Sequence, residues 1–365
     1  MNKDKLIVCG GGIIGITIAR EAALSGRFTE IRLLEKDNQL GTHSTTRNSG
    51  VIHSGFYYNP DSSKAKLCSL GNKLMREYCI NNNINIKKCG KIVVTKNKEQ
   101  EETLKKLYHQ GKINGCDLEI FNRNKLNEYE PLGLTYNNFL WSPNTWSVSP
   151  VEVFNSLIKD CQKLEIKFSI GERIIYADTN FIETSKNNKF YFDYLINACG
   201  GFSLEVSKLF GIKTHYQLLP FKGLYLKSIS KIKSFKRHIY PVPDLEQPFL
   251  GIHTTITSND FLKLGPTAIP VLSPENYSLF EGLNFKLSKE ILLLEISLFA
   301  KNVFGFRDLA FREIQYLLKD NILKKASELT TAKLSNIEFK WHSPGIRAQL
   351  FNNLSKKLEN DFVLI

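Results

Sequence analysis

A glycine-rich turn near the start of the chain holds the first residues whose types and spacing could do chemistry. Gly10, Gly12 and Gly15 fit the pattern G-x-G-x-x-G, and Glu35 lies 20 residues after Gly15. In such a motif the first glycine permits a tight turn, the second lets the backbone approach a pyrophosphate, and the third lets a helix pack closely on a strand. The N-terminus of that helix offers free N–H groups and a positive dipole end. Glu35 would accept hydrogen bonds from ribose hydroxyls, so the motif predicts a site for NAD or FAD.

A second candidate site is the loop over residues 37–55, which contains the run THSTTRNSGVIHSG. It is too polar for a core element and too long for a simple turn. Long loops in compact domains usually carry function. We expect its glycines and small hydroxyl residues to line a cofactor channel, with Arg47 facing a phosphate.

These residues need a strand–helix–strand unit to position them. Residues 5–9 and 31–34 are short apolar runs, and residues 13–24 form an apolar helical stretch that stops at Gly26. A further apolar run, residues 194–197, ends in small residues, as close backbone approach to a ligand requires. We therefore predict an α/β fold with a Rossmann-like, discontinuous nucleotide-binding domain.

Other segments predict helices and a second domain. Leu67, Leu70 and Leu74 recur at helical spacing, which indicates a helix face directed at the core. Short strands are expected over residues 218–226, 238–242, 249–255 and 261–264, and a last strand-like stretch over residues 341–350.

Composition limits the class of protein. The chain has 365 residues, 42% of them hydrophobic, a net charge of +13 and seven cysteines without C-x-x-C spacing. No apolar run is long enough to span a bilayer and no signal peptide precedes the first strand, so we expect a cytoplasmic location. The Lys and Asn residues are scattered along the chain, which argues against nucleic-acid binding. The cysteine spacing indicates neither a disulfide framework nor a metal site. Weak attraction to an anionic membrane surface stays open as an alternative.

Nine pieces, in one order, carry a family resemblance. They are STTRNSGVIHSGFYYNP, KAKLCSLGNKLMREYC, CGKIVV, NACGGFS, LPFKGLYL, IYPVPDLEQPFLGIHTT, LGPTA, PGIRAQL and NDFV. With these the chain resembles the FAD-dependent D-amino-acid-oxidase-like superfamily, and within it the L-2-hydroxyglutarate dehydrogenases and oxidases. The resemblance implies FAD as the cofactor and a second, α+β substrate domain built on an antiparallel sheet. The implied FAD-binding domain covers residues 1–85, 150–215 and 340–365, and the substrate domain residues 86–149 and 216–339.

The resemblance also implies roles for individual residues. Those expected to hold FAD are Gly10, Gly12, Ile13, Ile14, Gly15, Glu35, Lys36, Thr45, Arg47, Asn48, Ser49, Gly50, Ile174, Ala198 and Gly200. Those expected on the substrate side are His53, Lys222, Tyr225, His253 and Arg347, with Tyr57 and Tyr58 near the flavin.

The expected reaction is oxidation of L-2-hydroxyglutarate, or a close 2-hydroxy acid, to the 2-oxo acid by hydride transfer to the flavin. A histidine suits the proton transfer near neutral pH, and arginine suits a carboxylate. Each role has a structural alternative: His53 could only bond its loop, His253 could be a core residue, and Arg347, after Pro344-Gly345, could be a solvated residue at a turn. Oxygen or a membrane quinone would take the electrons, with the protein peripheral at the inner membrane face; the sequence does not give the oligomeric state.

Three departures from the family pattern bear on this prediction. Lys222 stands where the family usually has Arg, and Trp146 where it has Gly, which would narrow the pocket. Family members also continue past the segment that matches residues 360–363 with a strand, a turn at the flavin and a helix. The alternatives are thus an amino-acid or N-methyl amino-acid oxidase of the same superfamily, or a truncated, inactive homologue. An NAD dehydrogenase is disfavoured because the RNSGVIHSG loop has no place in that architecture.

Overall fold

The strand–helix–strand unit at the start of the chain forms as the sequence predicts. In the computed structural model, which describes residues 4–243 and 249–363, it consists of β1 (Asp4–Cys9), α1 (Ile13–Leu24) and β2 (Phe28–Glu35). Two further strands, β9 (Lys167–Ile170) and β13 (Tyr194–Asn197), complete a parallel sheet in the order β13-β1-β2-β9. Parallel pairing requires crossover connections, so the Rossmann-like part of the prediction is confirmed.

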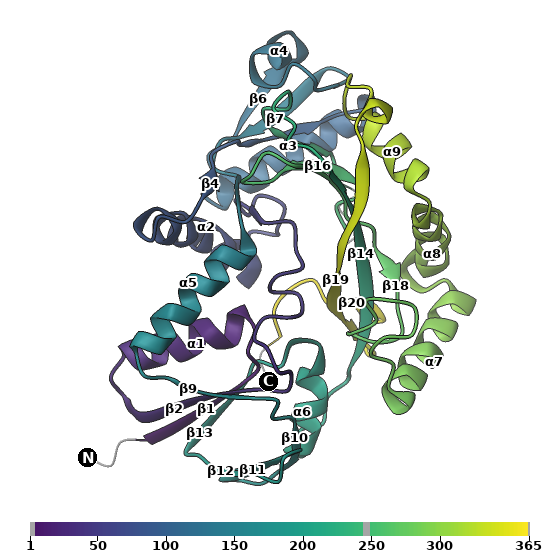
Figure 1. Ribbon diagram of the computed structural model, residues 1–365. Coiled ribbons are helices and arrows are strands. Elements are labelled where there is room, and N and C mark those ends of the chain that lie inside the picture. Colours follow the sequence, from purple (N-terminus) through teal and green to yellow (C-terminus); the bar gives the residue numbers. More distant parts are fainter. Residues whose placement is uncertain (1–3, 244–248, 364–365) are drawn as a thin grey trace.

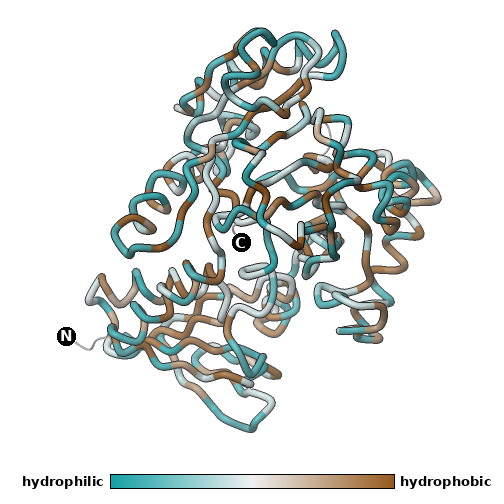
Figure 2. Tube along the Cα trace, turned by 45° about the horizontal axis from the view of Figure 1, so that its top comes forward, coloured by the Kyte–Doolittle hydropathy of each residue, from teal (hydrophilic) through white to brown (hydrophobic). Residues whose placement is uncertain are grey.

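The two faces of this sheet are covered by different elements. Leu6 and Val8 pack with residues of α1 and of α5 (Pro150–Lys163), whereas Ile7 and Cys9 pack against the small sheet β10 (Ile174–Ala177), β11 (Phe181–Thr184) and β12 (Lys189–Tyr191). This alternation follows from the period of two along a strand. Figure 2 shows the strands of this region as mostly hydrophobic tube and the surrounding turns as hydrophilic.

A large, mostly antiparallel sheet forms the second part of the molecule. Its strand order is β20-β19-β14-β17-β16-β15-β5-β7-β6, with β18 paired to β14, and of these pairs only β15 with β5 is parallel. The bounds of these strands are β5 Lys91–Val94, β6 Glu119–Asn122, β7 Asn138–Ser142, β14 Tyr216–Ser228, β15 His238–Pro241, β16 His253–Ile256, β17 Leu262–Gly265, β18 Ile269–Pro270, β19 Phe339–Asn352 and β20 Lys357–Leu358.

Helices shield the outer face of the large sheet. The long strands β14 and β19 run side by side through the molecule, and α7 (Phe285–Lys301), α8 (Phe306–Ile314) and α9 (Lys319–Ser327) lie on the side away from the parallel sheet (Figure 1). The inner face of β14 and β19 is therefore directed at the nucleotide-binding unit.

The remaining elements connect the two sheets. A small sheet β3-β8-β4 is built from β3 (Val51–Ile52), β8 (Trp146–Val148) and β4 (Ile86–Lys87). The other helices are α2 (Ser63–Asn81), α3 (Lys98–Ile113), α4 (Leu126–Tyr129) and α6 (Ser203–Leu209). No helix in the described ranges has both the length and the apolar character needed to cross a membrane.

The last expected strand is confirmed. The strand-like stretch over residues 341–350 lies within β19, which pairs with β14 from Tyr216 to Ser228. The alternative of a turn at Pro344-Gly345 was wrong, because Gly345 lies opposite Gly223 within that pairing. The assigned domain boundaries stay a prediction.

The second error concerns α2. Its leucine face does not enter the core: Leu67, Leu70 and Leu74 are 56%, 55% and 54% exposed. The buried residues of this helix are Ala65, Asn72 and Cys79 instead. Helical periodicity predicts that a helix has an apolar face, but it does not predict whether another element covers that face.

Candidate functional site

The glycine turn brings β1, α1 and β13 into close contact. Gly10 has φ +113°, and a Cβ there would lie 2.3 Å from the Ala198 carbonyl oxygen; a Cβ on Gly15 would lie 1.9 Å from the Gly10 oxygen. A Cβ on Gly12 would meet only the Thr45 hydroxyl, at 3.1 Å. Gly12 therefore has one side-chain hydroxyl and no backbone in front of it at the helix N-terminus, where a pyrophosphate would approach.

Glu35 holds the turn from the end of β2. Its buried carboxylate accepts hydrogen bonds from the backbone N–H of Gly11 (2.7 Å) and of Asp37 (3.0 Å). Thr45 accepts from the N–H of Ile13 at 2.9 Å, which ties the polar loop to the first turn of α1. The predicted cofactor-binding residues thus assemble around one edge of the parallel sheet.

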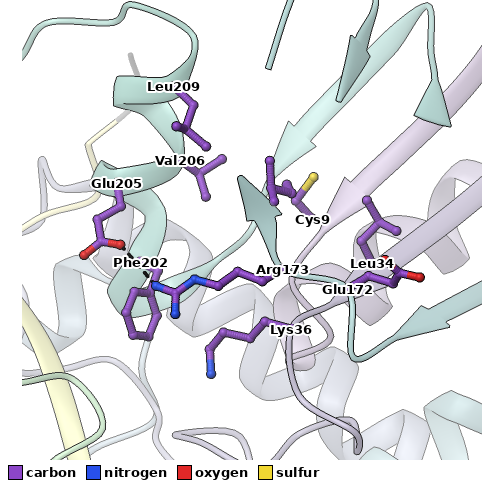
Figure 3. A pocket seen from close by; sticks show the side chains of 10 residues that line it. Cys9, Leu34, Lys36, Glu172, Arg173, Phe202, Glu205, Val206 and Leu209 are labelled. Carbon is purple, nitrogen blue, oxygen red and sulfur yellow. Dashed lines mark ion pairs between the residues drawn. The ribbon is translucent and has the colours of Figure 1, made fainter. Parts of the chain in front are cut away.

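A cavity of about 140 Å³ lies at this edge. Cys9 and Leu34 form its floor, with Arg173 and Lys36 reaching across toward Phe202 (Figure 3). The Arg173 and Lys36 cations lie 5.5 and 5.2 Å from the centre of the Phe202 ring, and Arg173 pairs with Glu205 at 3.5 Å. Ile174 also lines this cavity. An apolar floor with cationic groups at its rim suits an adenosine whose phosphates lie beside it.

Lys36 also anchors the loop of the nucleotide unit to the second sheet. Its ammonium pairs with Asp37 at 2.8 Å and with Glu275, and lies 3.2 Å from Nε2 of His43. Asp37, His43 and Glu275 could together offer ligand atoms to a metal, but the Lys36 ammonium already lies among them. We therefore treat this cluster as an ion-pair network.

A much larger cavity, of about 880 Å³, lies between the polar loop and the inner face of β14 and β19. Arg47, Asn48 and Ser49 line it from the nucleotide-binding side. Four of the five predicted substrate-side residues also line it, namely His53, Tyr225, His253 and Arg347. The two tyrosines expected near the flavin, Tyr57 and Tyr58, line it as well. The fold therefore joins residues that are almost 300 positions apart in the chain.

The fifth residue, Lys222, is not among the residues that line either cavity. Its neighbours Phe221 and Gly223 do line the larger one. Burial lowers the pKa of Lys222, and the nearby charge of Glu281 opposes that effect. Its position does not support the predicted substrate role.

Trp146 does not narrow the pocket either. Its indole N–H donates to the Pro143 carbonyl at 2.9 Å, and the cations of Arg76 and Lys88 lie 4.7 and 5.2 Å from its ring. It is absent from the lining of both cavities. The expectation based on this substitution was wrong because the side chain points away from the larger cavity.

The two cavity histidines are neutral bases. Nδ1 of His253 lies 2.8 Å from the Gly251 carbonyl, which can only accept, so the proton is assigned to Nδ1 and the lone pair to Nε2. The His253 ring stacks on Tyr240 with centroids 3.7 Å apart. Burial lowers the pKa of both His53 and His253 to about 3. Both imidazoles are therefore uncharged at neutral pH, and each keeps a lone pair on one ring nitrogen.

Arg347 is the cation of the opposite wall. It faces the cavity from β19, opposite Phe221 of β14, and its guanidinium lies 5.3 Å from the Phe249 ring. Burial lowers its pKa, and Tyr58 partly offsets that effect. The Arg347 side chain is exposed within the cavity, and a guanidinium in such a position is well suited to bind a carboxylate in a bidentate manner.

Two buried lysines near this cavity were missed by the sequence analysis. Lys263 of β17 donates to the Asn48 carbonyl at 3.0 Å and lies 4.4 Å from the Tyr225 ring, and burial lowers its pKa to about 8. Lys91 opens β5 and is fully buried. Both interrupt apolar strand segments, in CGKIVV and FLKLG, and a lysine in such a position is the signal that could have identified them.

Lowering the pH is expected to destabilise the fold through His53 and His253. Their folded-state pKa of about 3 lies below the value of about 6.5 in the unfolded chain. Between these values the unfolded state binds protons that the folded state does not. Stability therefore falls as the pH falls from about 6.5, by up to roughly 1.4 kcal/mol per pH unit for each histidine. Urea unfolding at several pH values measures this slope.

His253→Gln should flatten that dependence, whereas a matched variant of the exposed His109, His109→Gln, should keep it. Equal slopes in both variants would show that His253 does not titrate in this way.

Comparison with known proteins agrees with this geometry. The sequence pattern of the FAD dependent oxidoreductase (DAO) family matches residues 5–356. The mitochondrial L-2-hydroxyglutarate dehydrogenase of Caenorhabditis briggsae is 36% identical over 295 residues, which cover 76% of this chain and 66% of that protein. The human protein of the same name is 34% identical, over 76% of this chain and 63% of its own length. The chain thus spans about two thirds of these relatives.

Solved structures share the fold. The FAD-bound L-α-glycerophosphate oxidase of Mycoplasma pneumoniae superposes with a TM-score of 0.71 at 17% identity, over 100% of this chain and 86% of that one. The glycine oxidase of Geobacillus kaustophilus superposes with a TM-score of 0.69 at 15% identity, over 95% and 84%. The family match over residues 5–356, together with the glycine turn at the end of β1, shows that the chain belongs to the DAO family of FAD-dependent oxidoreductases.

Proposed function

We propose that the protein oxidises L-2-hydroxyglutarate, or a close 2-hydroxy acid, to the corresponding 2-oxo acid. The observation that carries this proposal is the larger cavity, whose lining combines an accessible guanidinium, that of Arg347, with two neutral imidazoles, those of His53 and His253. A hydroxy acid needs a cationic anchor for its carboxylate and a base for its hydroxyl proton. The names of the relatives at 36% and 34% identity support the same substrate.

FAD fits the residues on the nucleotide-binding side. Gly12 leaves room for the pyrophosphate, Glu35 lies where a ribose would bind, and the small cavity suits the adenine beside Ile174. The polar loop from Thr45 to Gly50 leads from there into the large cavity. When bound, FAD supplies the acceptor for the hydride that leaves the substrate carbon.

The chain's own residues would orient the substrate and move its proton. Arg347 binds a carboxylate by two parallel hydrogen bonds. Nε2 of His253, left with its lone pair by the bond from Nδ1 to Gly251, takes the hydroxyl proton as the C–H bond breaks. His53 and Tyr225 complete the wall around the reacting carbon. His53 is the second candidate for the base.

Anaerobic reduction of the bound flavin tests the proposed function. The purified protein should show flavin absorbance, or acquire it with added FAD, and L-2-hydroxyglutarate should bleach it. Bleaching by glycine or sarcosine but not by L-2-hydroxyglutarate would point to an amino-acid or N-methyl amino-acid oxidase instead. No flavin absorbance even after FAD addition would indicate an inactive homologue.

We further propose that oxygen or a membrane quinone takes the electrons, and that the protein is cytoplasmic and peripheral at the inner membrane face. Exposed apolar side chains on α7, among them Phe285, Leu293 and Ile296, support contact with such a surface. Co-sedimentation with quinone-loaded vesicles, and peroxide release in air, distinguish the two acceptors. Peroxide without vesicle binding would leave oxygen as the acceptor.

A further inference from the structure

Lys91 is fully buried, and its ammonium has no polar partner among the residues that the structure describes. Its ammonium lies 4.3, 4.5 and 4.6 Å from the ring centres of Phe56, Tyr57 and Tyr240. Within the part of the chain that the structure describes, Nζ has no hydrogen-bond partner and forms no ion pair. Its side chain has 0% exposure.

This arrangement is costly for a folded protein. An ammonium taken out of water loses its hydration, and cation–π contacts restore only part of that free energy. Burial accordingly lowers the pKa of Lys91 to about 7. A buried positive charge in this condition gains from any anion that comes near it, because the surrounding dielectric is low.

One layer of side chains separates this ammonium from the large cavity. Tyr57 both lines the cavity and contacts Lys91 with its ring. Tyr240, also in contact with Lys91, stacks on His253, which lines the cavity too. Lys91 therefore lies behind the histidine end of the cavity, and its charge contributes to the lowered pKa of His53 and His253.

On the basis of the proposed function, we propose that Lys91 supplies the positive charge that draws a carboxylate substrate to the histidine end of the cavity, acting across Tyr57 and Tyr240 rather than by contact. The ligand class is an organic dicarboxylate: Arg347 contacts one end of it, and the field of Lys91 attracts the other. Lys91 is a positioning residue in this scheme, since it touches neither substrate nor cofactor.

Within the cluster of titratable groups that surrounds Lys91, Lys91 is the group whose pKa lies near neutral pH. They come from α2, β15, β16 and the loops after β3 and α3, and they are Cys68, Cys116, Tyr57, Tyr240, His53, His238 and His253. Burial raises the pKa of these thiols and phenols and lowers that of these imidazoles. Ser142, paired with Lys91 from β7, does not titrate.

Anion binding and protonation of Lys91 are therefore linked. A bound carboxylate stabilises the charged form of Lys91, so binding above about pH 7 should take up a proton. Affinity for the anion should fall as the pH rises through this value.

Calorimetric titration of the FAD-loaded full chain with glutarate, a dicarboxylate that has no hydroxyl to oxidise, tests this inference. Runs in two buffers of different ionisation enthalpy give the protons taken up. We expect uptake of a large fraction of one proton at about pH 8 and almost none at about pH 5.5. The absence of uptake across this range in the unmodified protein would overturn the proposal.

Variants identify the group that takes up the proton. Lys91→Met should bind glutarate about tenfold more weakly at about pH 6 and lose the uptake, as a charge acting at a distance in a protein interior predicts. Lys91→Gln serves if the Met variant does not fold. The matched variant Lys263→Met removes another buried lysine, one that contacts the lining residues Asn48 and Tyr225, and should keep the uptake that begins near pH 7. Neutral glutaramide should bind all forms alike.

Glutarate binding that is unchanged in Lys91→Met, or uptake lost only in Lys263→Met, would overturn the role of Lys91. Because glutarate is not oxidised, proton-linked binding by a protein that fails to oxidise L-2-hydroxyglutarate would overturn the proposed function and leave the role of Lys91 standing.

Discussion

Arg347→Ala is expected to raise KM for L-2-hydroxyglutarate by about 30-fold or more. Losing the hydrogen bonds between a guanidinium and a carboxylate costs roughly 2 kcal/mol or more, which corresponds to that factor. Arg347 lines the cavity from β19, across from the polar loop, so the flavin content of the purified protein should not change. Steady-state kinetics together with the ratio of flavin to protein absorbance measure both quantities.

Arg347→Lys is the matched control. It keeps the positive charge but loses the planar fork that binds a carboxylate bidentately, so its KM should lie between those of the unmodified protein and the alanine variant. A KM unchanged in Arg347→Ala would refute the anchoring role. A loss of flavin in the alanine variant would assign Arg347 to the cofactor instead.

Gly15→Ala is expected to abolish FAD binding and to lower the midpoint of thermal unfolding. The added Cβ would lie 1.9 Å from the Gly10 carbonyl oxygen, which is backbone and cannot rotate away. Either α1 moves off β1 or the glycine turn opens, and both displace the groups that face the pyrophosphate. Forced overpacking of this kind costs about 1–3 kcal/mol. Flavin absorbance and differential scanning calorimetry report the two effects.

Gly71→Ala provides the comparison. Gly71 lies in α2 with no atom within 4 Å of its added Cβ. Alanine favours a helix by about 1 kcal/mol over glycine, so this variant should retain FAD and unfold at the same or a higher temperature. Full FAD binding by Gly15→Ala would mean that α1 can shift without disturbing the cofactor site.

Local patterns predicted the nucleotide-binding half of the molecule well. The order of β1, α1 and β2, the positive φ of Gly10 and the small-residue end of β13 all follow from short-range constraints. Each depends on the conformations that a few adjacent residues can adopt. The sequence segments that resemble the family added two predictions, FAD as the cofactor and the residues that face the large cavity.

Long-range pairing accounts for what the sequence alone did not reveal. The Pro-Gly pair at 344–345 is locally compatible with a turn. In the structure Gly345 instead pairs with Gly223, and β19 continues alongside β14. The leucines of α2 have helical spacing, but no element covers them. Which side of a strand or helix is buried depends on its neighbours in space, which periodicity does not specify.

The sequence by itself predicted a dinucleotide site at Gly10, Gly12, Gly15 and Glu35, because a tight turn, a close approach and a ribose acceptor need those residue types at that spacing. Only the tertiary structure decided which side chains meet in the large cavity. It placed Arg347 in the wall and Lys222 outside the lining. It also set Lys91 behind Tyr57 and Tyr240, without a polar partner in the described part of the chain. The physical reason is that burial and charge environment, which set the pKa and the affinity for anions, arise from packing between segments far apart in the chain.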